Sequence, residues 1–395
     1  LSGGVGYMVG TFFGVLLKAI IPSLITFNGT LSSWWGKIIT GALVLLFVAL
    51  QQIVMHGNLF KKKKGGYQLN LVEAWYSARI EGYEASMEDV LLARHTDLRA
   101  SVKELRKSLE TWHIFDSMTG STDPRRLHAS MFSYSRRGVD EESIMPDAGN
   151  YRTVPCWIGG PCPSMAVYVP PTPEEVPALM DTLISYIHDY KYDVVPTILK
   201  AGLVHAQFEN IHPFRDGNGR VGRELINSIF ASNYYSFVAG PISKVFYDKR
   251  QKYYNALNSV RETGSYITWL TYFFNCVTES CYLYVEHLSS LDAIIEDLKT
   301  HVAEHVTKDY FNVAFNAICP RLSNYGRISR GDLRVYGDPQ REKMLDLLGK
   351  LTEAGIVESK ELGDVQCWEY KPVLDFFYGI ESREETVAAN PTEHC

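Results

Sequence analysis

The sequence predicts a mainly α-helical protein with a small β-hairpin, transmembrane helices near its N-terminal end and a winged-helix unit near its C-terminal end. Three observations predict this fold class. Long apolar stretches fill the first 60 residues, helical periodicity dominates from about residue 69 to residue 290, and a helix followed by two short extended segments comes near the end. With 395 residues, 46% of them apolar, the chain can bury a sizeable core.

Charge and cysteine content exclude two classes of protein. The net charge of -6 at pH 7 gives the chain as a whole no electrostatic attraction for nucleic acid. The seven cysteines form no C-x-x-C pair and are odd in number, which is typical of reduced thiols and not of a disulfide framework or a zinc knuckle. Polyanions are therefore not the expected partners.

Residues 1–64 are predicted to anchor the chain in a membrane. The first 60 residues contain no acidic side chain, and the uncharged stretch at 38–55 has the length that crosses a bilayer, whereas the stretch at 7–27 is interrupted by Lys18 and Pro22. Lysines at 61–64 mark the cytoplasmic side of such a span. We expect one or two transmembrane helices with the catalytic part in the cytoplasm; packing into a soluble core, or a signal-like first segment, is the alternative.

The central part of the chain predicts helices around one extended segment. Thr172 and Glu175 form a capping box, and Pro173 suits the first turn of the helix that follows. The run at 195–211 is apolar on nearly all sides, as expected of a helix in the middle of a bundle. Residues 151–158 and 165–169 are extended around two glycines, which predicts a small exposed hairpin.

The last hundred residues predict a winged helix. An amphipathic helix with leucines at 345–351 ends at Gly355, and a strand at 356–357, a turn-rich stretch at 358–364 and an extended segment at 367–370 follow. Residues 327–370 carry seven basic and nine acidic side chains, a poor basis for holding DNA phosphates. Contact with protein is the better expectation for this unit, and DNA is an unlikely partner.

Residues 212–223 read HPFRDGNGRVGR and concentrate the groups that phosphate chemistry needs. Gly217, Asn218 and Gly219 can take positive φ angles, which turn successive backbone N–H groups into an anion site at the start of a helix. Arg220 and Arg223 are three residues apart on that helix and can hold the terminal phosphates of a nucleotide.

Two other side chains of this loop complete the predicted chemistry. Asp216 offers a hard oxygen ligand for Mg²⁺, and His212 can take up a proton near neutral pH. Together these groups predict nucleotidyl or phosphoryl transfer to a hydroxyl. A Walker-type ATPase is excluded, because the sequence has no G-x-x-x-x-G-K-[ST] segment.

The same loop resembles a known family. Residues 212–220 match every specified position of the signature H-P-F-x-[D/E]-G-N-G-R of Fic-domain protein adenylyltransferases, and Arg223 adds the second arginine of its extended form. The resemblance covers about residues 69–286, with further matching segments at 151–153, 157–160, 168–171, 253–254 and 256–257. A C-terminal winged helix is also common among bacterial relatives.

The resemblance implies a Fic-type helical bundle that transfers AMP from Mg-ATP to a Ser, Thr or Tyr hydroxyl of a target protein. It implies that His212 is the catalytic base and that Asp216 holds Mg²⁺. The implied ATP-binding residues are Phe214, Gly217, Asn218, Gly219, Arg220, Arg223 and Tyr254. The hairpin, called the flap in this family, would dock the target's backbone through Cys156, Trp157, Ile158 and Gly159. Self-modification and a homodimer are further partner hypotheses, and relatives that transfer UMP, phosphate or phosphocholine leave the donor open.

Ser77, Glu81 and Gly82 resemble the family's inhibitory motif, [S/T]-x-x-x-E-[G/N], placed here before the catalytic core. The resemblance implies that Glu81, on a helix, pairs with Arg220 and so removes the guanidinium that orients the γ-phosphate. In some relatives the same glutamate supports removal of AMP. The alternative interpretation is a surface carboxylate on an ordinary helix.

The predicted organisation has four parts: a membrane anchor at 1–64, an inhibitory helix region at 65–110, a Fic catalytic domain at 111–290, and a C-terminal helix with a winged-helix-like domain at 291–395. Three other interpretations compete with an adenylyltransferase. Residues 301–305 read HVAEH and fit the H-x-x-E-H zinc-protease pattern, although a solvated helix face explains them better. The winged helix suggests a DNA-binding or protein-binding regulator with a nucleotide-sensing module, and a pseudoenzyme would keep the loop for binding alone.

Overall fold

The computed structural model describes residues 66–92, 95, 98, 121–133, 147–188, 195–232 and 241–389. The chain from Gly65 to Cys395 forms a compact unit of its own. The predicted membrane spans at 7–27 and 38–55 lie outside the described residues and stay a prediction. In the part that is described, no helix combines the length and the apolar character that crossing a bilayer requires.

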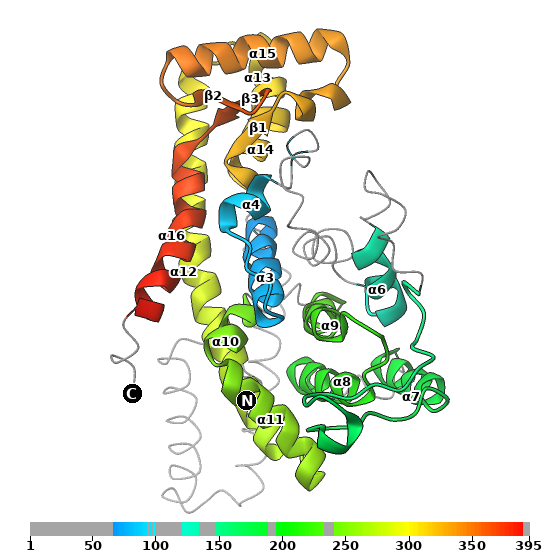
Figure 1. Ribbon diagram of the computed structural model, residues 1–395. Coiled ribbons are helices and arrows are strands. Elements are labelled where there is room, and N and C mark those ends of the chain that lie inside the picture. The colour runs from blue at the N-terminus through cyan, green and yellow to red at the C-terminus, as the bar shows by residue number, and fades with distance from the viewer. Residues whose placement is uncertain are drawn as a thin grey trace, which may run out of the picture. The chain divides into compact units, whose positions relative to one another are not determined.

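The described part of the chain is mainly helical, as predicted, with one small sheet (Figure 1). Its α-helices are α3 (Gly66–Ile80), α4 (Met87–Leu92), α6 (Pro124–Ser133), α7 (Val176–His188), α8 (Thr197–Ile211), α9 (Asn218–Ser232), α10 (Ile242–Asp248), α11 (Arg250–Thr263), α12 (Ile267–His305), α13 (Phe311–Val313), α14 (Cys319–Tyr325), α15 (Asp338–Glu353) and α16 (Lys371–Ala389). The strands are β1 (Arg327–Ser329), β2 (Glu358–Leu362) and β3 (Val365–Glu369), and short 3₁₀ or π segments are η6 (Pro163–Met165), η8 (Lys308–Tyr310), η9 (Ala314–Ile318) and η10 (Gly331–Val335).

Helix α8 lies at the centre of the catalytic bundle and contacts α7, α9 and α12. Its apolar character on nearly all sides follows from this position, and Gly202 allows α12 to approach closely: a Cβ there would lie 2.8 Å from the Phe273 ring. The Trp269 indole donates a hydrogen bond to the Gly202 carbonyl over 2.7 Å. One bond of the predicted capping box forms ahead of α7, where the Thr172 N–H donates to the Glu175 carboxylate over 2.8 Å. These contacts hold α8 in place and so fix the position of the loop that follows its C-terminal end.

Helix α3 packs against α9 and α10, which brings the segment with the predicted inhibitory motif to the catalytic bundle (Figure 1). Glu73 anchors this packing as a buried carboxylate that accepts hydrogen bonds from the Ser243 N–H at 2.8 Å and the Ser243 hydroxyl at 2.5 Å. Burial raises the pKa of Glu73 to about 7, while the bonds from Ser243 oppose this shift. The position of α3 is therefore set by a polar contact as well as by its apolar face.

Near the C-terminal end a helix is followed by two paired strands, as predicted, but the predicted strand bounds were wrong. The stretch at 358–364, expected to be turns, contains β2, and the turn is confined to Gly363 and Asp364. The strands pair antiparallel in the order β1–β3–β2. Four of the five β2 residues are exposed, so β2 has no alternating apolar pattern by which the sequence could reveal it.

The predicted hairpin at 151–158 and 165–169 is also smaller than expected. The described residues pair there through a single antiparallel bridge between Ile158 and Tyr168. The turn contains Gly159 at φ 68° and Gly160 at φ 75°, and a Cβ at Gly160 would lie 2.2 Å from the Met165 carbonyl oxygen. The two glycines thus make a tight turn that other residues would strain, and the described segment around them contains bends and the 3₁₀ turn η6 instead of a strand ladder.

Candidate active site

The loop predicted to carry the chemistry joins the end of α8 to the start of α9. His212 caps α8 in a left-handed conformation, at φ 51°, and its N–H donates to the Phe208 carbonyl over 2.9 Å. A positive φ is uncommon for any residue other than glycine and is found often at functional sites. The backbone therefore turns sharply at His212, and 24% of its side-chain surface stays exposed.

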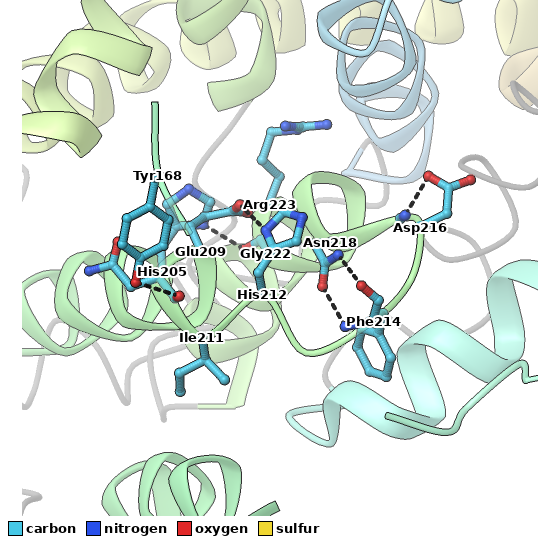
Figure 2. A network of polar contacts seen from close by, with 12 residues as sticks. Tyr168, His205, Glu209, Ile211, His212, Phe214, Asp216, Asn218, Gly222 and Arg223 are labelled. Atoms are coloured by element: carbon cyan, nitrogen blue, oxygen red, sulfur yellow. Dashed lines mark hydrogen bonds and ion pairs between the residues drawn. The ribbon is translucent and has the colours of Figure 1, made fainter. Parts of the chain in front are cut away.

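Asn218 holds the loop closed. Its side-chain oxygen accepts the Phe214 N–H over 2.8 Å, and its side-chain nitrogen donates to the Phe214 carbonyl over 2.8 Å, as Figure 2 shows. The side chain of Asn218, a predicted ATP-binding residue, thus uses both polar atoms inside the loop. The backbone N–H of Asn218 is the group left for contact with phosphate. The ring of Phe214 is fully buried and stacks on His128 at 3.9 Å between ring centroids, so this aromatic residue packs the core, and its predicted contact with ATP stays a prediction.

Asp216 lies at the outer edge of the same loop. Its carboxylate accepts the Gly217 N–H over 2.7 Å and lies 3.3 Å from the Arg220 guanidinium, with 41% of its side-chain surface exposed. Gly217 has a φ of 84°, as predicted, whereas Asn218 and Gly219 have no positive φ because they begin helix α9. A Cβ at Gly217 would lie 2.2 Å from the Met131 side chain. The loop therefore presents one accessible carboxylate close to a buried arginine.

The predicted pairing of Glu81 with Arg220 is wrong, because Glu81 pairs with Arg223. The Arg223 guanidinium donates to the Glu81 carboxylate over 2.7 Å, and it also donates to the Ser77 hydroxyl and the Ser77 carbonyl, each over 2.8 Å. Arg223 lies on the face of α9 toward α3, whereas Arg220 reaches Asp216 and lies over the Tyr83 ring. Although burial opposes it, the Glu81 carboxylate raises the pKa of Arg223, so this cation stays charged.

Glu81 also occupies the start of α9. It lies one residue beyond the end of α3, in a turn that Gly82 completes at φ 85°. A Cβ added at Gly219 would lie 2.3 Å from the Glu81 carboxylate, which places this anion directly against the N-terminal turn of α9. The N-terminus of a helix is where a phosphate is expected to bind, so the carboxylate stands where an outer phosphate of a nucleotide would be held.

Arg152 joins the flap to the catalytic loop, and sequence reasoning assigned it no role. Its side chain is fully buried and donates to the His212 carbonyl over 2.9 Å and to the Pro171 carbonyl. The backbone N–H of Arg152 donates to the Pro213 carbonyl over 2.8 Å. Its guanidinium therefore supports the left-handed turn at His212. The sequence offered a weak signal, because Arg152 lies within one of the segments that resemble the family.

The other predicted site residues lie around this loop. Trp157 and Gly159 are exposed, Cys156 and Ile158 are half-buried, and Tyr254 lies half-buried on α11 with the Arg250 guanidinium over its ring. Trp157 donates to the Gly160 carbonyl over 3.3 Å. Their roles in docking a target and in lining an adenine pocket stay predictions.

The His212 imidazole is held neutral. Burial and the neighbouring cations Arg261 and Arg152 together lower its pKa to about 4, while the Glu209 carbonyl and the Glu81 carboxylate oppose the shift. A neutral imidazole is the form that accepts a proton. At neutral pH the ring is therefore ready to act as a base.

His128 is a second buried imidazole that supports the loop, and sequence reasoning missed it because no motif surrounds it. It lies on α6, where its Nδ1 accepts the Gly149 N–H over 2.8 Å and its Nε2 lies 3.0 Å from the Asp216 carbonyl. These partners assign the neutral tautomer with the proton on Nε2. Burial lowers its pKa to about 4.

We expect His128 to make the folded protein less stable as the pH falls. Its pKa is about 4 in the folded protein and 6.5 when unperturbed, so the unfolded chain binds more protons between these values. Between pH 7 and pH 4 the free energy of unfolding should fall by about 3 kcal/mol more in the parent than in His128→Gln. Urea unfolding at a series of pH values measures this difference. The buried carboxyls contribute equally to the pH dependence of both proteins, so their effect cancels in the comparison. Parallel pH curves would contradict the assignment.

The comparison with protein families agrees with this geometry. Residues 121–230 match the model of the Fic/DOC family. This segment is similar to Fic domains. The matched segment includes α6, α7, α8 and most of α9, and so it contains the whole loop that joins α8 to α9.

Curated relatives of the Fic domain carry an enzyme's name. The probable protein adenylyltransferase aq_aa38 of Aquifex aeolicus (strain VF5) is 31% identical over 153 residues, which are 38% of this chain and 43% of the relative. The protein adenylyltransferase Fic of Drosophila grimshawi is 24% identical over 177 residues, 42% of this chain and 34% of the relative. The chain thus spans less than half the length of each.

A further relative has a different kind of name. The inner membrane ABC transporter permease protein YjfF of Escherichia coli (strain K12) is 56% identical over 52 residues, which are 13% of this chain and 16% of that protein. Among solved structures, a Fic family protein from Desulfovibrio desulfuricans G20 is similar with a TM-score of 0.44 and 18% identity, over 84% of this chain and 95% of that one.

The zinc-protease alternative finds no support in the described part of the chain, where no three metal-binding side chains gather. His301 on α12 lies 3.3 Å from Asp297, and the His305 ring bonds the His301 carbonyl over 2.9 Å. Both histidines are exposed on the helix surface. The H-x-x-E-H pattern is therefore a solvated helix face.

Proposed function

We propose that the Fic domain transfers AMP from Mg-ATP to a Ser, Thr or Tyr hydroxyl of a protein. The observation that carries this proposal is the position of His212, a neutral and partly exposed imidazole at the mouth of a glycine-rich loop that opens helix α9. Arg220 and Arg223 on the first turns of α9 supply positive charge for phosphates. The names of the relatives support the nature of the transferred group.

In this mechanism His212 removes the proton of the target hydroxyl as the hydroxyl oxygen attacks the α-phosphorus of ATP. A new oxygen–phosphorus bond forms, and the bond from the α-phosphorus to the oxygen that bridges the α- and β-phosphates breaks. Pyrophosphate leaves with that electron pair, and the proton remains on the imidazole until solvent takes it. The backbone N–H groups at the start of α9 bind the phosphates, and the Asn218 brace fixes their direction.

Asp216 is suited to hold Mg²⁺. Magnesium binds through one or two carboxylates together with phosphate oxygens of the substrate, and Asp216 presents an accessible carboxylate at the edge of the loop. When bound, the ion would neutralise phosphate charge. The nearby Arg220 balances the carboxylate in the structure, so the two groups fit a site that binds both cation and phosphate.

We also propose that Glu81 restrains this activity. Its carboxylate pairs with Arg223 and lies against the start of α9, so it competes with an outer phosphate of ATP for the same cation and the same helix end. ATP would then bind in a pose that is unsuited to attack. The sequence predicted that Glu81 would restrain the enzyme by pairing with Arg220, whereas in the structure it pairs with Arg223.

The flap is proposed to hold the target protein. Its extended segment has few backbone partners, and it exposes apolar side chains at Trp157, Met165, Val167 and Val169. An added strand can use the free backbone groups, and apolar side chains of the target can cover the exposed ones. The hydroxyl to be modified would then lie beside His212, to which Arg152 connects the flap.

The test is the fate of labelled phosphate. The Glu81→Gly variant, expected to be active, is incubated with Mg²⁺ and a lysate or itself as target, once with α-labelled and once with γ-labelled ATP. AMP transfer puts the α-label on protein and none of the γ-label. Transfer of the γ-label would show phosphoryl transfer instead, and absence of both labels at all concentrations would overturn the proposed activity.

We propose in addition that residues 1–64 anchor the enzyme in a membrane with the catalytic part on the cytoplasmic side. The uncharged stretch at 38–55 and the lysines at 61–64 support this. Retention of the full chain on vesicles after an alkaline carbonate wash is the expected result. Complete release would contradict the proposal.

A further inference from the structure

Glu209 is a buried carboxyl beside the proposed base, and the mechanism above gives it no role. It lies on α8 three residues before His212, so the two side chains share one face at the end of the helix. Its Oε2 is 4.0 Å from His212 Nδ1, and 8% of its side-chain surface is exposed. Figure 2 shows the two side chains facing each other above the loop.

Each side chain of this pair has one buried polar atom without a hydrogen bond. His212 Nδ1 and Glu209 Oε1 are both buried and make no hydrogen bond of full geometry with the residues that the structure describes, and the Glu209 carbonyl is the other acceptor near the imidazole. Buried polar atoms are nearly always bonded, so two unpaired atoms on neighbouring side chains point to a contact that forms at another stage of the reaction. A shift of under 1.5 Å in either side chain would bring Oε2 and Nδ1 within hydrogen-bond distance.

The neighbouring helix leaves room for this carboxyl. A Cβ at Gly222 on α9 would lie 2.5 Å from Glu209 Oε1, so glycine at 222 is required for the carboxyl to lie where it does. On the other side, the Arg261 guanidinium donates to the Glu209 carbonyl over 3.2 Å and holds the backbone of this turn. Gly222 and Arg261 together thus fix the position of the Glu209 carboxyl beside the imidazole.

Several charged groups surround the pair. Those with an electrostatic effect on Glu209 or His212 are Arg152, Arg223, Arg261 and Glu81, and the hydroxyl of Tyr253 on α11 is also near Glu209. Burial raises the pKa of Glu209 to about 7, while Arg223 opposes this shift. Above that pH the carboxyl is ionised and accepts hydrogen bonds.

We infer that Glu209 is a positioning residue, which holds the proton of neutral His212 on Nδ1 and so leaves Nε2 to receive the proton of the target hydroxyl. This inference rests on the proposed function. When the imidazole takes up the proton it becomes a cation, and the carboxylate then gains a charge-assisted contact with it. The same division of roles, a carboxylate that orients an imidazole base, operates in hydrolytic triads.

The first test is spectroscopic and uses no ATP. The full chain is labelled with ¹⁵N-histidine, and the His212 signals are assigned by their loss in His212→Ala. At pH 8 we expect His212 of the parent to carry its proton on Nδ1, and we expect Glu209→Gln to give a mixture of both tautomers. A proton on Nε2 in the parent, or an unchanged tautomer in Glu209→Gln, would overturn the inference.

The second test is kinetic and is made in the Glu81→Gly background. Glu209→Gln keeps the volume of the side chain and removes its charge, so kcat for AMP transfer should fall about 10- to 100-fold with an unchanged KM for ATP. Glu209→Asp, which keeps the charge on a shorter side chain, should recover part of this loss. A merely structural role predicts lower thermal stability for both variants with no difference in kcat between them.

Glu224→Gln is the matched control. Glu224 is a fully buried carboxyl on α9 that contacts Ser228. Its replacement should leave both the His212 tautomer and kcat unchanged, and an equal loss of kcat in this variant would contradict the inference. The two proposals can fail separately. If no variant transfers AMP but Glu209→Gln still changes the His212 tautomer, the proposed function is wrong and the inferred role of Glu209 in positioning the imidazole is retained.

Discussion

Glu81→Gly should raise the rate of AMP transfer about 10- to 100-fold. This factor corresponds to the free energy of one charge-assisted hydrogen bond, which the substitution removes from the restrained state. Glu81 bonds Arg223 at 2.7 Å and lies against the first turn of α9. Without its carboxylate, the Arg223 guanidinium and the start of α9 are both released for the outer phosphates of ATP. The measurement is incorporation of α-label into protein per unit time at saturating ATP.

Glu84→Gly is a suitable control for this activation. Glu84 is exposed and lies three residues further along the segment that follows α3. The control therefore removes the same charge and adds the same backbone freedom without touching Arg223. Equal rates in the parent and Glu81→Gly would disprove the restraint, and equal activation by both variants would assign the effect to the segment's flexibility.

The correction from Arg220 to Arg223 shows where sequence reasoning about this site ends. The spacing of three residues correctly placed both arginines on the first turns of one helix, and both are buried. The sequence could not show which of them faces α3, because that depends on how α3 packs against α9 and α10 through Glu73 and Ser243, far apart in the chain. Local signals therefore gave the residues of the site, and tertiary packing decided their partners.

The same distinction explains the other differences. The capping box ahead of α7 and the glycine turns were predictable, because each depends on neighbours in the sequence. The support given by Arg152 and His128 was not, since each reaches a backbone carbonyl of the catalytic loop from a distant segment. The burial of Phe214 was not predictable either, because a residue inside a binding motif can serve the core as well as the ligand.

His212→Ala in the Glu81→Gly background should lower the rate of AMP transfer about 10²- to 10⁴-fold, the usual contribution of a general base. The imidazole is neutral at the pH of the assay, and its partly exposed ring is the group that meets the incoming hydroxyl. Binding of ATP should change little, because the phosphates are held by the start of α9 and its arginines. The α-label assay gives the rate, and equilibrium binding of ATP gives the affinity.

Two further measurements separate loss of the base from loss of the fold. His305→Ala removes an exposed imidazole on α12 and should keep the full rate. Free imidazole in the buffer should restore part of the activity of His212→Ala, because the truncated side chain leaves a space open to solvent that a small base can enter. A His212→Ala variant that transfers AMP at the parent's rate would show that another group removes the proton, and the loop would then serve only to hold phosphates.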